Sequence, residues 1–253
     1  MSRPFLGLLL VSLFVIALVV TVPARVVNLV LPSGQVIMNG YSGTLWDGRA
    51  ARCALATGNG YFHLGTVQWT LDAWSLLLFS PSLNIQSQWG RQRITGQIQI
   101  DGGQSFSLKD IEASVSARVL QRFLPVAVDG NFDATVSHLQ IENGLPIVGE
   151  GRLGWRNAGW ESSQGMMPLG SYALDFKQVR SGPLRGDVAT ISGPVEASGG
   201  VTLTSQSYDL DILLTSDGGL NSQLKHALSL IAQPLAEGYR IVLTGQLTEI
   251  EKK

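Results

Sequence analysis

The chain is poor in cysteine and in charge. Its single cysteine, Cys53, excludes an internal disulfide and a cysteine-based zinc site. We expect this thiol to pack as a small apolar residue in a strand. A chain with a single thiol is also compatible with an oxidising compartment, because it has few thiols that could mispair. Only 15% of the 253 residues are charged and the net charge is −1, without a basic field or an acidic tail. Nucleic acid is therefore not expected as a partner.

Spacings typical of catalytic and metal sites are also lacking. The three histidines, His63, His138 and His226, lie far apart without HxxxH or HxH spacing, so no metal site, catalytic base or cofactor is predicted. No serine stands in a G-x-S-x-G motif. A pair of carboxylates acting on a glycan stays open, because such residues need only be neighbours in space.

The N-terminus carries the longest apolar run of the chain. Residues from Phe5 to Val22 include no charge, and Arg3 precedes them. At about 1.5 Å per residue, this run approaches the ~30 Å hydrocarbon core of a bilayer. It exceeds the h-region of a cleavable signal peptide, and Pro23 precedes the nearest cleavage-like residue. We therefore predict a cytoplasmic tip and transmembrane signal anchor over residues 1–24, with residues 25–253 in the periplasm.

Most of the remaining chain alternates apolar and polar residues with a period of two. The alternation is clearest in QRITGQIQI (92–100), NFDATVSH (131–138), SYALDFKQ (171–178) and GYRIVLTGQL (238–247). It predicts strands with one buried face and one solvent-exposed face, which are typical of an antiparallel sheet. The 29 glycines suit turns and a strongly curved sheet. The predicted fold is mainly β: a transmembrane helix and then one curved antiparallel sheet domain.

Two or three short helices are expected within this domain. Apolar residues at helical spacing predict one over residues 116–124, ending at Pro125, and one over residues 221–236, which Pro234 ends or kinks. AWSLLLF (73–79) predicts one helical turn before Pro81.

The stretch GYSGTLWDGRA (40–50) combines glycines with a tryptophan. It has no lysine for a phosphate loop and no following helix for a dinucleotide site. A sugar platform on Trp46 is open chemically. A hairpin is favoured: Gly40 and Gly43 relieve a turn, Thr44 to Trp46 begin a strand, and Asp47-Gly48 closes or bulges it.

Several motifs in the same order resemble those of protein N of the bacterial type II secretion system. They are the G-x-x-G-T-L-W-x-G-x-A pattern of residues 40–50, VQWTLDAWSLL (67–77), and residues 128–160, 168–176 and 237–247. The junction before them departs from the family's Leu-Pro-Ala, because Val22 precedes Pro23-Ala24. The family also looks similar to AsmA-type β-sheet membrane proteins.

The resemblance implies a non-enzymatic, bitopic inner-membrane component that supports export of folded periplasmic proteins across the outer membrane. Its partners would be other type II secretion proteins and the inner membrane. No catalytic residue carries over from the family. We expect a structural role for the residues that match its signature: Gly40, Gly43, Thr44, Leu45, Trp46, Gly48 and Trp69.

Two other functions stay open. A lipid- or lipopolysaccharide-handling module would use an apolar trough on the sheet, although the same residues suit an ordinary core covered by the helices. An enzyme acting on envelope glycans would use the tryptophans and scattered carboxylates. The candidate trough residues are Ile94, Ile98, Ile100, Leu174, Phe176, Ile241 and Leu243.

Overall fold

The structure of the chain is a computed structural model. It describes residues 3–29, 31, 34–57, 60–102, 105–122, 128–162, 165–180, 182–204, 207–216, 218–220, 222–229 and 231–246. The chain divides into two compact units, Met1–Gly90 and Arg91–Lys253. Both are built mainly of antiparallel strands, which confirms the predicted β class.

The first unit holds the N-terminal helix and four strands, paired in the order β1-β2-β3-β4. Its elements are α1 (Arg3–Val20), η1 (Ala24–Leu29), β1 (Val36–Gly43), β2 (Asp47–Thr57), β3 (Gly60–Leu71), α2 (Ala73–Leu77) and β4 (Ser82–Trp89). Helix α2 forms where the sequence predicts a turn of helix. Its N-cap is Asp72, whose side chain accepts a hydrogen bond from the Trp74 N–H.

Helix α1 forms within the predicted anchor segment. Within the residues that the structure describes, however, no helix combines the length and the apolar character needed to cross a membrane. The transmembrane assignment of residues 1–24 stays a prediction.

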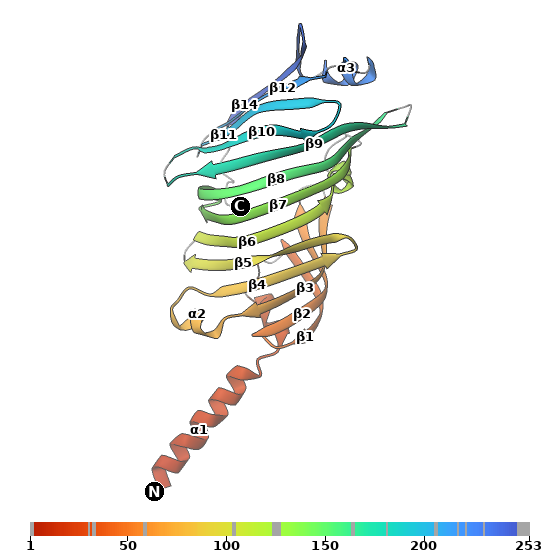
Figure 1. Cartoon of the computed structure of the whole chain (residues 1–253). Helices are drawn as coiled ribbons and strands as arrows, with labels where there is room; N and C mark the ends of the chain where they lie inside the picture. Colours follow the sequence, from red (N-terminus) through yellow and green to blue (C-terminus); the bar gives the residue numbers. More distant parts are fainter. Residues whose placement is uncertain are drawn as a thin grey trace. The chain divides into compact units, whose positions relative to one another are not determined.

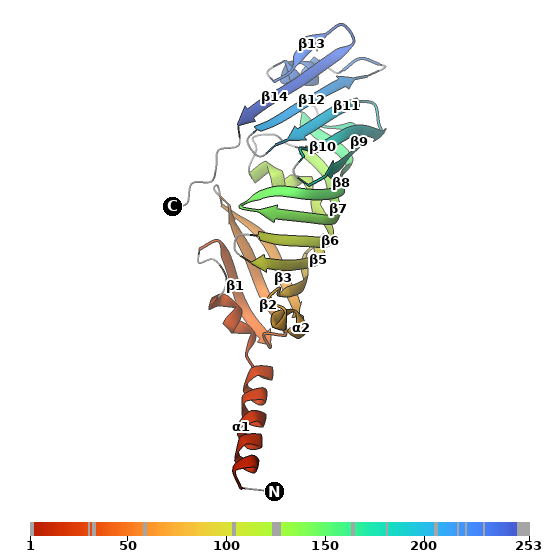
Figure 2. The same ribbon diagram turned by 90° about the vertical axis from the view of Figure 1, so that its left-hand side faces the viewer.

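The second unit is a sheet whose strands lie side by side in the order β5 to β12, then β14 and β13 (Figures 1 and 2). The first strands are β5 (Gln92–Gly102), β6 (Ser105–Ser116), β7 (Val128–Glu142), β8 (Leu145–Ser162) and β9 (Gly165–Gln178). The others are β10 (Leu184–Ser192), β11 (Glu196–Leu203), β12 (Ser207–Thr215), β13 (Gln233–Leu235) and β14 (Gly238–Gln246). Its helical segments are η2 (Ala117–Arg122) and α3 (Ser222–Leu228).

The four strands expected from alternation are confirmed as β5, β7, β9 and β14. Register shifts interrupt several pairings, as between Val136 and His138 on β7. Such bulges bend the bulged strand and increase its twist.

The predicted helix over residues 221–236 is wrong in its second half. Helix α3 ends at Leu228, and Gln233–Leu235 forms β13, paired with β14. Pro234 lies on this short edge strand, where a missing N–H disturbs no ladder. The expected helix over 116–124 is a 3-10 helix, η2. The predicted ends at Leu124, Asn221 and Leu247 lie outside the described residues.

Candidate functional site

The residues of the signature stretch form a tight hairpin between β1 and β2. Gly43 pairs with Gly48, and the Thr44 N–H donates to the Asp47 carbonyl at 2.8 Å. The Asp47 N–H donates in turn to the Thr44 hydroxyl at 3.1 Å. Gly43 has a φ of +81°, and a Cβ there would collide with the Asp47 carbonyl, so this position requires glycine.

The hairpin prediction was therefore correct, but its assignment of residues was wrong. Thr44, Leu45 and Trp46 make the turn itself and not the start of a strand, while Asp47 and Gly48 begin β2. The reason is the Thr44 hydroxyl, which bonds the backbone three residues later and so closes the loop. Residues 44–47 are called the junction loop below.

The junction loop binds the C-terminal end of helix α1. The Trp46 indole N–H donates to the Val19 carbonyl at 2.8 Å, and the Leu45 N–H donates to the Val22 carbonyl at 2.8 Å. Pro23 forms an isolated antiparallel bridge with Thr44. The last four carbonyls of a helix have no partner within it, and α1 ends at Val20. Trp46 thus caps the helix from the sheet.

Trp69 on β3 packs against the junction loop and forms a hydrogen bond with it. It is 4% exposed, and its indole N–H donates to the Leu45 carbonyl at 3.0 Å. Its ring occupies the space where a Cβ of Gly48 would stand, so Gly48 provides room for the ring. Ala24, the first residue of η1, belongs to the same buried cluster as Trp69. The junction loop therefore joins the end of α1 to the strands of the first unit.

The other residues singled out in this unit have packing roles. Gly40 lies on β1 with a φ of +73° and faces Ala51. Cys53 is buried in the Trp69 cluster, and this burial raises the pKa of its thiol. His63 stacks on Trp89, with ring centroids 5.5 Å apart. Among the residues that the structure describes, no three His, Cys, Asp or Glu side chains gather as metal ligands would.

The second unit brings all seven candidate trough residues to one face of its sheet. Residues directly opposite in an antiparallel ladder share a face. From β5 to β14 the opposed residues run Ile94, Ala113, Ala134, Leu153, Leu174, Val188, Gly199, Ile212 and Ile241. Beside this row, Ile98 opposes Leu108, Ile100 opposes Phe106, Phe176 opposes Gly151 and Leu243 opposes Leu210. We call this surface the apolar face.

Parts of the apolar face are open and one end of it is covered. Leu153 is 44% and Leu243 49% exposed. Helix α3 packs Leu224 and Leu228 into a cluster that includes Ile241. The Phe176 ring packs against Gly151: a Cβ added to Gly151 would lie 2.8 Å from that ring. The expected cover by helices is thus present at Ile241, whereas the middle of the face, around Leu153, stays accessible.

An aromatic row crosses the apolar face. Phe132, Trp155 and Tyr172 oppose one another on β7, β8 and β9, with centroids 5.4 and 6.1 Å apart. The Tyr172 hydroxyl donates toward the carbonyls of Leu169 and Val195, and burial raises the pKa of Tyr172 to about 12. It therefore stays neutral at physiological pH.

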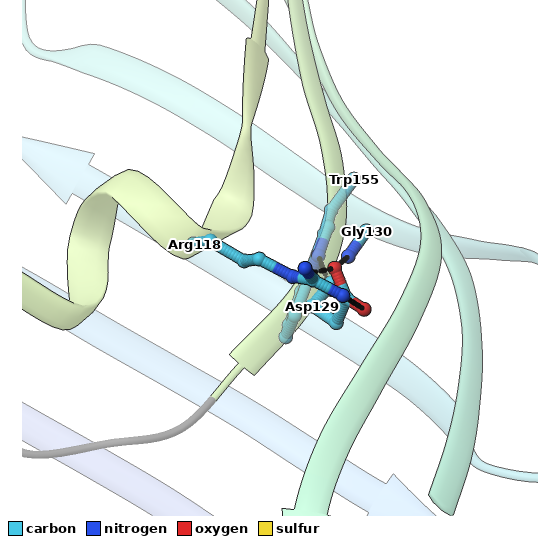
Figure 3. A network of polar contacts seen from close by, with 4 residues as sticks. All are labelled: Arg118, Asp129, Gly130 and Trp155. Atoms are coloured by element: carbon cyan, nitrogen blue, oxygen red, sulfur yellow. Dashed lines mark hydrogen bonds and ion pairs between the residues drawn. The ribbon is translucent and has the colours of Figure 1, made fainter. Parts of the chain in front are cut away.

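A polar network ties η2 to this aromatic row (Figure 3). Arg118 makes a bidentate ion pair with Asp129 at 3.1 and 2.8 Å. The Gly130 N–H donates to the same carboxylate, and the Trp155 indole N–H donates to the Asp129 carbonyl at 3.0 Å. These contacts position the start of β7 against Trp155.

The opposite face of the sheet is polar and carries cross-strand ion pairs. Their members are Arg152–Asp175, Arg156–Asp133, Lys177–Glu150 and Arg240–Asp211. The hydrogen-bonded guanidinium of Arg152 lowers the pKa of Asp175, and Arg240 lowers the pKa of Asp211 in the same way. Apart from Asp133, whose side chain is 28% exposed, these groups are exposed, so each pair stabilises the fold only weakly.

We expect Asp175 and Asp211 to make stability fall in acid. Because their folded pKa values are depressed, the pairs stabilise the fold fully above the unfolded pKa of about 3.9 and lose this effect as pH falls through the folded values. Thermal melts should be flat from about pH 6 to 8 and decline below about pH 4. In a variant with Asp175→Asn and Asp211→Asn, which is less stable at neutral pH, the decline should be shallower. Parallel declines in both proteins would contradict this assignment.

In sequence comparisons, the family model and the relatives that match the chain carry the same description. The family model described as "Type II secretion system (T2SS), protein N" matches residues 34–242. The chain is 30% identical to a protein of Aeromonas hydrophila named "Type II secretion system protein N", over 91% of this chain and 94% of the relative. A Vibrio cholerae protein of the same name is 27% identical, over 95% and 97%. No solved structure matches the chain.

Proposed function

Because the chain belongs to the type II secretion system protein N family, we propose that it is an accessory component of the type II secretion pathway. In this role it supports export of folded periplasmic proteins across the outer membrane and acts without catalysis. Its partners are other proteins of the secretion system. The observation that carries the proposal is the family match over residues 34–242, together with two relatives of that name.

The proposal places helix α1 in the inner membrane and both sheet units in the periplasm. The uncharged run from Phe5 to Val22 supports this placement, as do the exposed apolar side chains around the helix from Leu9 to Val20. A helix that is apolar on all sides is typical of a membrane span. The junction loop then couples the anchor helix to the strands of the first unit through Trp46 and Leu45.

A secretion assay tests the proposed function. In a strain lacking the chain, we expect a folded substrate of the pathway to accumulate in the periplasm and to decrease in the medium. The full chain should restore secretion, and crosslinking in the restored strain should capture other secretion components. Unchanged secretion in the deletion strain, with no such crosslinks, would contradict the proposal.

A second variant tests the anchor. Replacing residues 1–24 by a cleavable signal peptide should release residues 25–253 into the periplasm. We expect this version to restore secretion poorly, because the sheet units are no longer held at the inner membrane. Full restoration of secretion by this version would show that the secretion role does not require the membrane anchor.

The apolar face supports a second candidate function, the binding of lipid acyl chains. The accessible middle of this face around Leu153 and Leu174 is uncharged across consecutive strands. Acyl chains suit such a surface because they offer no polar group that the face would leave unpaired. In this candidate function the chain holds periplasmic lipid or lipopolysaccharide on the sheet.

A further inference from the structure

The segment between β3 and β4 exposes large apolar side chains. Residues 72–81, here called the α2 loop, contain helix α2 and the residues around it. Trp74 is 75%, Leu78 78% and Phe79 91% exposed, and Leu77 is similarly open. No charged residue occurs in AWSLLLFSP (73–81). Neighbouring exposed apolar side chains of this size are typical of an interaction site.

The outward orientation of these side chains is built into the α2 loop. Ser75 is its buried side chain: its hydroxyl donates to the Asp72 carbonyl at 2.6 Å and accepts from the Ser82 N–H at 2.8 Å. The Ser80 N–H donates to the Ser75 carbonyl. The polar residue thus points inward and the apolar ones point outward, the reverse of an ordinary surface helix.

The backbone at the tip of the α2 loop adds to this arrangement. Phe79 has a φ of +57°, in the left-handed region that a bulky residue rarely adopts. Its N–H donates to the Leu76 carbonyl at 3.1 Å. Such a conformation persists only where its surroundings impose it, and it tends to occur at functional positions.

The α2 loop lies at the end of the first unit where helix α1 leaves. The Leu71 N–H, directly before the loop, donates to the Trp46 carbonyl at 2.8 Å. The indole of the same Trp46 caps Val19 of α1. Figures 1 and 2 both show α2 at the end of these strands nearest α1. The α2 loop therefore lies beside the C-terminal end of α1. A membrane that contains α1 up to this end would also contact the α2 loop.

We infer that the α2 loop inserts into the periplasmic leaflet of the membrane that holds α1, as a second contact beside the helix. This inference rests on the proposed anchoring of α1. Trp74 suits the interfacial region, where an apolar ring with one polar N–H is favoured. Leu77, Leu78 and Phe79 suit the acyl boundary below it. Because the loop has no basic residue, its insertion is hydrophobic and does not depend on anionic lipid.

Fluorescence of the full chain in vesicles of phosphatidylethanolamine and phosphatidylglycerol tests the inference. Phe79→Cys is labelled with an environment-sensitive fluorophore; the unsubstituted chain reports any labelling of Cys53, which is buried. Tyr61→Cys is the matched control, because Tyr61 is also exposed and lies about 30 Å away along β3. Nitroxide-bearing lipids should quench the label at 79 roughly twofold or more and leave the label at 61 nearly unchanged.

The native tryptophans provide a second readout without a label. Brominated lipids should quench part of the tryptophan emission, and Trp74→Phe should remove much of that part. Trp89→Phe is the control, since Trp89 is also exposed but lies on β4 away from the loop. Loss of quenching in both variants or in neither would count against the inference.

Flotation separates failure of the inference from failure of the proposed anchor. If the chain floats with the vesicles and the label at 79 is quenched, the inference is supported. If it floats and positions 79 and 61 are equally unquenched, the inference is overturned while the anchor stands. If the chain does not float, both are overturned. Equal insertion into vesicles of neutral lipid alone is also expected, and a requirement for anionic lipid would refute the hydrophobic mode.

Discussion

Replacing Trp69 by alanine is expected to lower the free energy of unfolding of the first unit by about 3–5 kcal/mol. Trp69 is almost fully buried, and its ring fills the space above Gly48. The substitution also removes the donor to the Leu45 carbonyl, so the junction loop loses its support. Urea unfolding of the detergent-solubilised chain, followed by far-UV circular dichroism, measures the change.

Two substitutions control this prediction. Trp89→Ala removes the same side chain from an exposed position and should cost only about 1 kcal/mol. Trp69→Phe retains most of the ring but not the indole N–H, and should cost about 1–3 kcal/mol because a half-buried carbonyl loses its partner. If Trp69→Ala and Trp89→Ala lowered the free energy of unfolding equally, the packing of Trp69 against the junction loop would not be a main source of stability.

Placing a carboxylate on the apolar face is expected to reduce lipid retained by the purified chain about tenfold or more, equivalent to ~1.4 kcal/mol or above. The substitution is Leu153→Glu, at a partly exposed position in the middle of that face. An acyl chain would then have to cover an ionised group, which is unfavourable without a partner. Mass spectrometry of lipid extracted from equal amounts of protein measures the loss.

Leu213→Glu is the matched control for this experiment. Leu213 on β12 is also partly exposed, but it opposes Arg240 and Ser198 and so lies on the polar face. It should keep its lipid. Equal lipid content in the two variants, or no lipid in the unsubstituted chain, would remove the second candidate function without affecting the secretion role.

The elements that the sequence predicted well are those with strong local patterns. Alternation identified β5, β7, β9 and β14, since a strand with one buried face needs no information from its neighbours. The errors occurred where tertiary contacts override local preference. Residues 233–235 became a strand because β14 pairs with them, and Thr44 to Trp46 became a turn because the Thr44 hydroxyl closes it.

The candidate sites divide in the same way. The sequence singled out Trp46 and Trp69 by their place in a motif, but not their bonds to Val19 and Leu45. It predicted a helical turn at residues 73–79, and missed that its apolar residues face outward. A useful indication was present, because AWSLLLF is apolar on all sides and contains a single small polar residue, Ser75.

By itself the sequence determined the β class, the family, and the separation of apolar from polar residues along each strand, because period-two alternation is a local property. Only the tertiary structure decided which residues of different strands form one surface. Strand order and bulges set the register, and a shift of one residue would move Leu153 to the opposite face from Leu174. The tertiary structure also decided the orientation of the α2 loop, because the inward hydrogen bonds of Ser75 turn Trp74 and Phe79 outward.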